Sequence, residues 1–336
     1  MRRFDFPHIG SFQAQNKFFC ENPLEEAWSQ IARFGTTDFL SNYAPQNKEI
    51  NWKKYLQYVE VRIRQAVEFR EASRHATLLT APLPLYYSFL NLTRAFLALG
   101  PEIMPRPGHG LKFIRAEKLL DSKAQIIRGT FADYLDACKL PWKETDEITL
   151  GQALGFIIEL CHEYTKIDEV PSFIQPVVIS AMMGGEVRLS FPNYLGNFAE
   201  NWQNNFPDLS EICALEDNNT LFVTNKELGK DINNVSQLAR DHFLQPLIIQ
   251  SHATWYKFLH NKNGLNLNRI AYYYIAMFIL GSVVRYEPEL MLNASAPESQ
   301  LGWFLKRFLT LAERFFPQLK LMEVHQSELY FSGSGL

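Results

Sequence analysis

The sequence predicts a mainly α-helical protein of the α+β class, in which a small insert containing a β-hairpin interrupts a helical core. Apolar residues recur at helical spacing between Trp52 and His75. The stretch from Pro82 to Gly100 is apolar on nearly every side of a helix, which is typical of a helix buried in a core. Two short apolar runs flank Gly184-Gly185, a pattern that predicts a hairpin with a two-residue turn.

The composition is that of an ordinary globular protein whose core needs no disulfide or metal support. The chain has 336 residues, of which 47% are hydrophobic and 21% charged, and its formal charge is −3. This charge argues against non-specific coating of nucleic acid, which needs a basic surface, but it leaves room for a local basic pocket. The four cysteines are scattered through the chain, so we expect reduced thiols and no zinc site.

Two features predict a cytoplasmic protein that no membrane segment anchors. The first eight residues include two arginines but no apolar run follows them, so they do not resemble a secretory signal. The longest apolar run, Ile270–Val284, has 15 residues and includes three tyrosines. It is therefore too short and too polar to span a bilayer.

The order of the elements suggests four regions. Residues 1–50 are expected to form an N-terminal arm that packs on the body through its aromatic residues. A helix is expected over 24–34, since Asn22-Pro23 can cap and start it. Residues 51–170 form the first half of the helical core, residues 171–230 the α+β insert, and residues 231–336 the second half of the core.

The helix over 82–100 carries a thin polar stripe. Tyr87, Asn91 and Arg94 are spaced by four and three residues, so they share one face. A buried arginine and asparagine need partners, because an unsatisfied buried polar group costs about 1–3 kcal/mol. Two interpretations stay open, a stripe that faces a ligand and a structural network within the protein.

A loop is expected between Gly100 and Arg115, and it gathers basic residues. Arg106 and His109 lie among prolines and glycines, which hold the shape of a loop and free its backbone N–H groups. Such a loop could cradle an anion. Alternatively, it is a rigid connector.

The remaining elements follow from local patterns. A strand over 125–131, a helix over 131–138 and a helix over 150–164 with Thr149 as its N-cap complete the first half of the core. The insert holds the hairpin over 177–191, a helix over 195–206 and a strand over 221–224. The second half consists of a helix over 238–259 bent at Pro246, a helix over 267–286, a helix over 301–316 that stops at Pro317, and a strand-like tail.

Two blocks of sequence resemble the YaaC-like family of prokaryotic proteins. The first joins Leu85-Tyr86-Tyr87, Asn91-Leu92 and Arg94-Ala95 to His109-Gly110-Leu111, and the second is Leu280–Pro288. The general layout extends the resemblance over roughly residues 55–290, and it implies a fold more than an activity. The Tyr-Tyr helix followed by His-Gly is also similar to HEPN helical domains, many of which are RNA-cutting toxins or antiviral effectors. This second resemblance implies a HEPN-like helical core.

The resemblance implies a protein that handles RNA or a nucleotide, as an effector in prokaryotic antiviral defence would. As an enzyme it would be a metal-independent, ribonuclease-like one, without a cofactor, since the common cofactor motifs are missing. The candidate catalytic residues are His109, Arg94 and Asn91, and the candidate binding residues are Tyr87, Arg106, Arg285 and Tyr286. His109 would move protons and the arginines would hold phosphate. Arg94, His109 and Arg285 should then converge in one cleft.

Arg70 and His75 form a second candidate nuclease pair. Their spacing, Arg-x4-His, is the one that HEPN nucleases use, whereas Arg94 and His109 are too far apart to match it. Cations are also common at the C-terminal end of a helix for electrostatic reasons alone. Two other functions stay open, a non-catalytic scaffold subunit that binds a protein partner or forms a homodimer, and an enzyme acting on a phosphorylated metabolite.

Overall fold

A computed structural model gives the fold of the chain, and its helices and small sheets confirm the predicted mainly α (α+β) class. The structure describes residues 15–42, 52–100, 104–160, 163, 174–181, 187–191, 202–205, 210–211, 213–217, 220–224, 244–246, 257–260, 265, 267–296 and 299–332. The helices are α1 (Pro23–Arg33), α2 (Thr37–Ser41), α3 (Trp52–Arg74), α4 (Pro82–Leu99), α5 (Thr130–Ala137), α6 (Leu150–Gly155), α8 (Trp202–Asn205), α11 (Arg269–Tyr286), α12 (Pro288–Ala294) and α13 (Gln300–His325), with 3-10 turns η1 (Leu119–Asp121) and η2 (Ile158–Leu160). The strands are β1 (Gln15–Phe19), β2 (His109–Ile114), β3 (Lys123–Gly129), β4 (Glu147–Thr149), β5 (Ile174–Ala181), β6 (Val187–Ser190), β7 (Cys213–Asp217), β8 (Thr220–Val223), β9 (Leu244–Pro246), β10 (Lys257–His260) and β11 (Glu328–Ser332).

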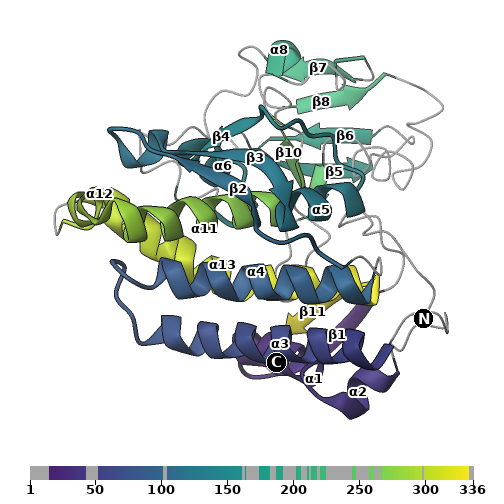
Figure 1. The fold of residues 1–336 in the computed structure, drawn as a ribbon. Coiled ribbons are helices and arrows are strands. Elements are labelled where there is room, and N and C mark those ends of the chain that lie inside the picture. Colours follow the sequence, from purple (N-terminus) through teal and green to yellow (C-terminus); the bar gives the residue numbers. More distant parts are fainter. Residues whose placement is uncertain are drawn as a thin grey trace.

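Helix α4 is the central layer of the helical body. It lies between α3 on one side and α11 on the other, and α13 also packs against it (Figure 1). Fourteen of its 18 residues are buried, as its apolar sequence predicted. Phe89 of α4 stacks on Phe316 of α13 with ring centroids 3.8 Å apart. On the opposite side, Gly281 of α11 lets the two helices approach closely, because a Cβ there would lie 3.2 Å from the Cβ of Tyr86.

Helix α13 continues through Pro317, so the predicted end of the helix at this proline was wrong. Proline removes the backbone donor that would bind the carbonyl group of Glu313, four residues earlier. The indole Nε1 of Trp28 in α1 donates to that carbonyl oxygen at 2.9 Å and replaces the missing bond. The sequence alone suggested that the helix ends at Pro317. A contact from the distant helix α1 instead stabilises the helix across this proline.

The segment predicted as a loop up to Arg115 becomes strand β2 from His109 onward. In the described residues β2 pairs with β3, and β3 pairs with β4, to form a three-stranded antiparallel sheet. The pairing of β2 and β3 is irregular between His109 and Leu111. This sheet lies next to α5 and α11 (Figure 1). The loop prediction was wrong from His109 onward. Pairing with β3 makes this segment a strand, although its glycines and prolines are typical of a loop.

Strands β5 to β8 of the predicted insert form a separate sheet together with β9 and β10, which come from the region predicted as the second half of the core, in the order β7-β8-β6-β5-β10-β9. The antiparallel pair β5 and β6 matches the predicted hairpin, although its Gly184-Gly185 turn lies outside the described residues. The predicted helix over 238–259 was wrong, because residues 244–246 and 257–260 are β9 and β10. Pairing of β10 with β5 and β9 overrides the helical pattern there. Of the predicted helix over 195–206, the structure describes only residues 202–205, which form α8.

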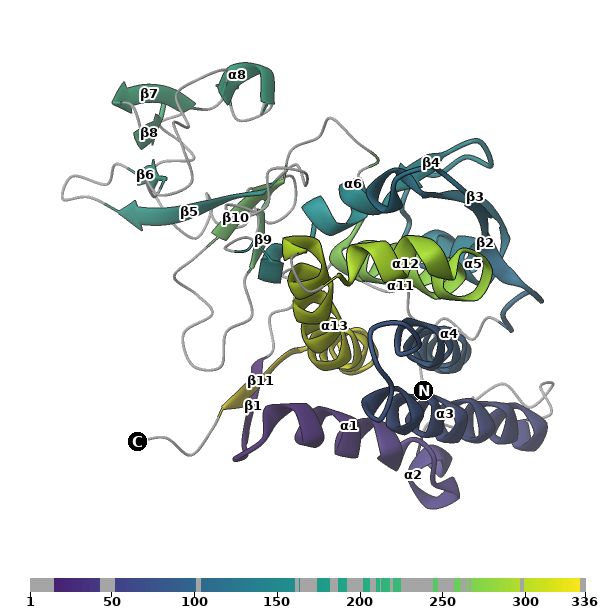
Figure 2. The ribbon, with the colours of Figure 1, turned by 90° about the vertical axis from the view of Figure 1, so that its left-hand side faces the viewer.

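The arm and the C-terminal tail meet in the smallest sheet. Strand β1 pairs in parallel with β11, from Gln15 opposite Glu328 to Phe19 opposite Ser332, and α1 packs on α13 (Figure 2). Helices α1 and α6 have the predicted caps, Asn22 and Thr149, but α6 ends at Gly155 and not near residue 164. In the part of the chain that the structure describes, no helix has the length and apolar character needed to cross a bilayer.

Candidate functional site

The most complete candidate site is a cavity of about 180 Å³ where α4, β2 and α11 meet. It brings together residues that lie more than 200 positions apart in the sequence, from Leu83 to Tyr286. Four of the predicted site residues lie in its wall. The lining residues are Leu83, Tyr86, Tyr87, His109, Leu111, Phe113, Phe278, Gly281, Ser282, Arg285 and Tyr286. The wall is thus mostly aromatic, and these lining residues include no carboxylate.

The backbone around His109 depends on two glycines. Gly110 has a φ of +81° and Gly129 a φ of +145°, which favour glycine over residues with a side chain. The two residues also approach each other closely, since a Cβ on Gly110 would lie 2.5 Å from the backbone nitrogen of Phe131, and one on Gly129 would lie 2.6 Å from that of Gly110. This contact joins the start of β2 to the end of β3 and sets where His109 enters the cavity.

Arg94 and Asn91 belong to the architecture around the cavity and are absent from its lining. Arg94 donates from Nε to Thr130 Oγ1 at 3.0 Å and from Nη2 to the carbonyl oxygen of Gly108 at 3.0 Å. Asn91 accepts a hydrogen bond from Arg62 at 3.1 Å and donates one to the carbonyl oxygen of Tyr87 at 2.8 Å. Of the two interpretations of the polar stripe, the structural network fits these two residues. Of the three residues of the polar stripe, only Tyr87 lines the cavity.

Arg106 also lies outside the cavity wall. Its guanidinium pairs with the buried carboxylate of Asp133, and its backbone N–H donates to the same carboxylate at 2.7 Å. A longer contact of 3.5 Å reaches Asp136. Arg106 therefore fixes the segment before β2 against α5. Because its guanidinium is paired with Asp133, it is not free to bind an anion in the predicted loop.

Among the described side chains that line the cavity, His109 and Tyr86 form a hydrogen-bonded pair. The Tyr86 hydroxyl lies 2.7 Å from His109 Nδ1. Burial raises the pKa of Tyr86 well above its usual range, so its phenol keeps its proton. Burial also lowers the pKa of His109, and the positive charges of Arg94 and Arg285 lower it further. Both effects favour the neutral form of His109.

Arg285 is the positively charged residue among the described residues that line the cavity. Its side chain is exposed at the end of α11, and its guanidinium carbon lies 5.0 Å from the ring centroid of Tyr286, which is 58% exposed. Among the described residues no carboxylate forms an ion pair with Arg285, whereas the neighbouring Glu287 pairs with Arg115 at 2.8 Å. An arginine held on an aromatic ring at the mouth of a cavity is well placed to bind an anion.

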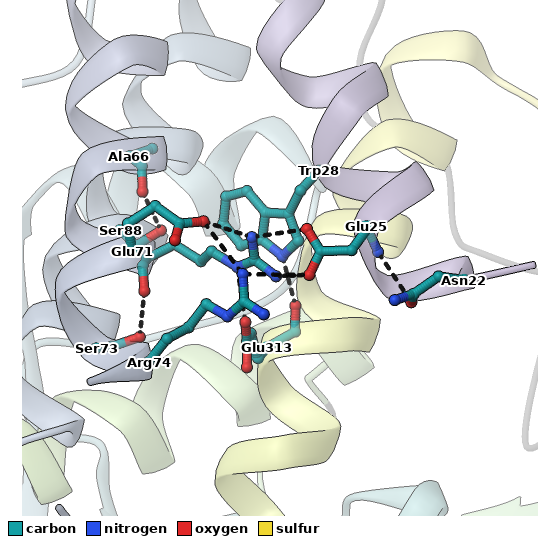
Figure 3. A network of polar contacts seen from close by, with 10 residues as sticks. Asn22, Glu25, Trp28, Ala66, Glu71, Ser73, Arg74, Ser88 and Glu313 are labelled. Atoms are coloured by element: carbon teal, nitrogen blue, oxygen red, sulfur yellow. Dashed lines mark hydrogen bonds and ion pairs between the residues drawn. The ribbon is translucent and has the colours of Figure 1, made fainter. Parts of the chain in front are cut away.

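Arg70, the first residue of the alternative nuclease pair, is surrounded by carboxylates. Its guanidinium contacts Glu25 at 2.6 Å, Glu313 at 2.6 Å and Glu71 at 2.7 Å, and only 3% of its side chain is exposed. Figure 3 shows these three carboxylates converging from α1, α3 and α13, with Trp28 beside them. His75 is exposed. The geometry favours a structural role for Arg70 as the centre of a junction between three helices.

A larger groove of about 620 Å³ runs along α3. Its lining includes exposed Val61 and Met104 as well as Arg62, whose guanidinium carbon lies 5.1 Å from the ring centroid of Tyr58. None of the predicted site residues lines it. In the described part of the chain, no cluster of three or more histidine, cysteine, aspartate or glutamate side chains could hold a metal ion.

The sequence analysis missed Tyr86 and Phe278 as members of the site. Both are mainly apolar residues on buried helices, so their pattern predicts core positions. The one available signal was that Tyr86 belongs to the same block as His109. It could not show contact between them, because 23 residues separate the two and the segment that begins at His109 did not resemble a strand.

The family model described as YaaC-like Protein matches residues 26–324, a range that includes every residue of the cavity wall. A search of the curated proteins and a search of the solved structures each found no match. The HEPN-like character of the core therefore stays a prediction from sequence.

Proposed function

The chain belongs to the YaaC-like family, and from this premise and the cavity geometry we propose that it handles RNA or a nucleotide, with a base in the aromatic cavity and a phosphate at Arg285. The observation that carries the proposal is the combination of aromatic walls, an arginine without a carboxylate partner among the described residues, and a neutral histidine. A base that stacks on an aromatic side chain gains about 1–3 kcal/mol. A guanidinium binds phosphate oxygens in a bidentate manner.

The size of the cavity limits what can enter it. A volume of about 180 Å³ corresponds to roughly six water molecules at about 30 Å³ each, and sites for drug-sized ligands usually span about 300–1,000 Å³. A single base or a phosphate group fits this space, but a complete nucleotide does not. The rest of the ligand would lie at the mouth, against the exposed Tyr286.

Different residues of the cavity wall would bind different parts of the ligand. Tyr87, Phe113 and Phe278 offer apolar ring surface, and His109 offers a ring nitrogen for hydrogen bonding. Arg285 neutralises negative charge at the mouth. The proposal extends to a role in prokaryotic antiviral defence only through the HEPN resemblance of the sequence. Cleavage of RNA by a metal-independent route is a further step, tested by incubating single-stranded RNA with the protein in EDTA.

Replacing Arg285 by glutamine is expected to weaken nucleotide binding at least tenfold, about 1.4 kcal/mol, because the phosphate loses its charged partner. Isothermal titration with the four nucleoside 5′-monophosphates and a short single-stranded RNA measures this. The matched control is Arg128→Gln, since Arg128 is exposed on β3 and pairs with Glu144. No binding by the unmodified protein, or equal affinity in the Arg285 variant, would contradict the proposal.

The second candidate function is the non-catalytic scaffold subunit. It is favoured by the observation that Asn91 and Arg94 serve the architecture and by the groove along α3. The same titrations separate the two candidates. A scaffold should bind none of these ligands, and its Arg285 variant should differ from the unmodified protein in no measured property.

A further inference from the structure

We infer that Tyr86 is a positioning residue that holds His109 in the tautomer with its proton on Nε2, so that the cavity presents a fixed N–H donor to its ligand. The statement about the ligand rests on the proposed function, whereas the statement about the tautomer concerns the free protein. Tyr86 and His109 come from different elements, α4 and β2, and their pairing exists only in the folded chain.

The argument begins with the buried hydroxyl of Tyr86. Tyr86 is 3% exposed, and a buried hydroxyl hydrogen needs an acceptor. The structure gives it one described partner, His109 Nδ1, at 2.7 Å. Tyr274 packs edge-on against Tyr86 with ring centroids 5.7 Å apart, and its hydroxyl lies near enough to help raise the pKa of Tyr86. The Tyr274 hydroxyl nevertheless makes no hydrogen bond of normal geometry, so His109 Nδ1 is the acceptor that the geometry favours.

The hydrogen bond determines the tautomer of His109. An imidazole nitrogen accepts a hydrogen bond only when it carries no proton, so acceptance at Nδ1 places the single proton of the neutral ring on Nε2. If the proton were on Nδ1, the Tyr86 hydroxyl hydrogen would be left buried without its acceptor, at a cost of about 1–3 kcal/mol by the usual penalty for such groups.

The surroundings keep the ring neutral. Arg94 of α4 and Arg285 of α11 act on His109 with positive charge, and Tyr87 of α4 packs near it with ring centroids 6.2 Å apart. None of the described residues that line the cavity is acidic. Burial works in the same direction and lowers the pKa of His109. The donor at Nε2 is therefore present throughout the neutral pH range.

The ligand follows from this chemistry. The lone pair on Nδ1 is already used by Tyr86, so the resting His109 has no free basic nitrogen and acts as a donor, as Arg285 does. The cavity should take a planar ring or phosphate that presents a hydrogen-bond acceptor, such as a base carbonyl group, a ring nitrogen or a phosphate oxygen. In this state His109 recognises the ligand and does not remove a proton from it.

Long-range ¹H–¹⁵N NMR of the free protein tests the tautomer, with the His109 signals assigned by their loss in His109→Gln. We expect the Nε2–H pattern at pH 7 and a titration midpoint below about 6.5. In Tyr86→Phe the neutral ring loses its donor, so the midpoint should move upward and the Nδ1–H form should appear. Tyr58→Phe, a tyrosine on α3 outside the cavity, should leave both unchanged.

Two results would overturn the inference: a His109 that carries its proton on Nδ1 in the unmodified protein, and a folded Tyr86→Phe protein with an unchanged tautomer and midpoint. The first is independent of how well any variant folds. Because the spectra are recorded without ligand, they can fail while nucleotides still bind, and they can agree while nucleotides do not bind. The outcomes therefore distinguish this inference from the proposed function.

Discussion

Replacing Arg70 by methionine is expected to lower the free energy of unfolding by about 3 kcal/mol or more, the cost of removing one partner from a buried ion pair. Methionine keeps much of the side-chain length but leaves Glu25, Glu71 and Glu313 without their shared cation. The carboxylate of Glu313, at 17% exposed, is the least able to regain water. Helices α1, α3 and α13 would lose the centre of their junction.

Urea denaturation followed by circular dichroism measures this change, and His75→Ala is the matched control. His75 is exposed, so its removal should change the unfolding free energy by less than about 0.5 kcal/mol. If Arg70 instead served mainly as a nuclease residue, the methionine variant would keep its stability and lose RNA cleavage. A stable Arg70→Met protein would thus contradict the structural role.

Replacing Gly110 by alanine is expected to cost about 3 kcal/mol or more and to disturb the cavity. The positive φ alone costs about 1–2 kcal/mol with a side chain. The added Cβ would also lie 2.5 Å from the backbone nitrogen of Phe131, which cannot move aside without shifting α5. Overpacking of this kind adds typically 1–3 kcal/mol.

Gly108 provides the matched control for Gly110. Its φ is +88°, close to that of Gly110, but a Cβ there would meet nothing within 4 Å. Gly108→Ala should therefore show the backbone cost alone, and denaturation of the two variants separates strain from collision. Equal losses in both would mean that the close approach of β2 and β3 does not hold the site together.

The helices of the core were predictable because their patterns are local. The apolar residues of α3 and α4 recur at helical spacing, and Asn22 and Thr149 are side chains that cap helices in most contexts. Strands β9 and β10 were not predictable, since the pairing of β10 with β5 and of β9 with β10 outweighs their local preference. Pro317 misled for the same reason, because the indole of Trp28 that stabilises it lies almost 290 residues away in sequence.

The candidate site was predictable in part. His109, Arg285, Tyr87 and Tyr286 lie on one cavity wall, as two blocks of family-like sequence suggested. Arg94 acts on His109 electrostatically but does not line the cavity, so the expected meeting of Arg94, His109 and Arg285 in one cleft is only partly seen. The sequence could show which residues are polar on a buried helix, but not whether a protein group or a ligand would satisfy them.

The measurement that tests the central proposal most directly is photo-crosslinking with 5-iodouridine 5′-monophosphate, followed by mass spectrometry of the labelled peptides. The compound reacts with aromatic side chains that it contacts under ultraviolet light. We predict saturable labelling of Tyr87, Phe278 or Tyr286, which competing uridine 5′-monophosphate prevents and Arg285→Gln reduces. Labelling confined to Tyr58 in the groove of α3, or labelling that does not saturate, would contradict the proposal that this cavity binds nucleotides.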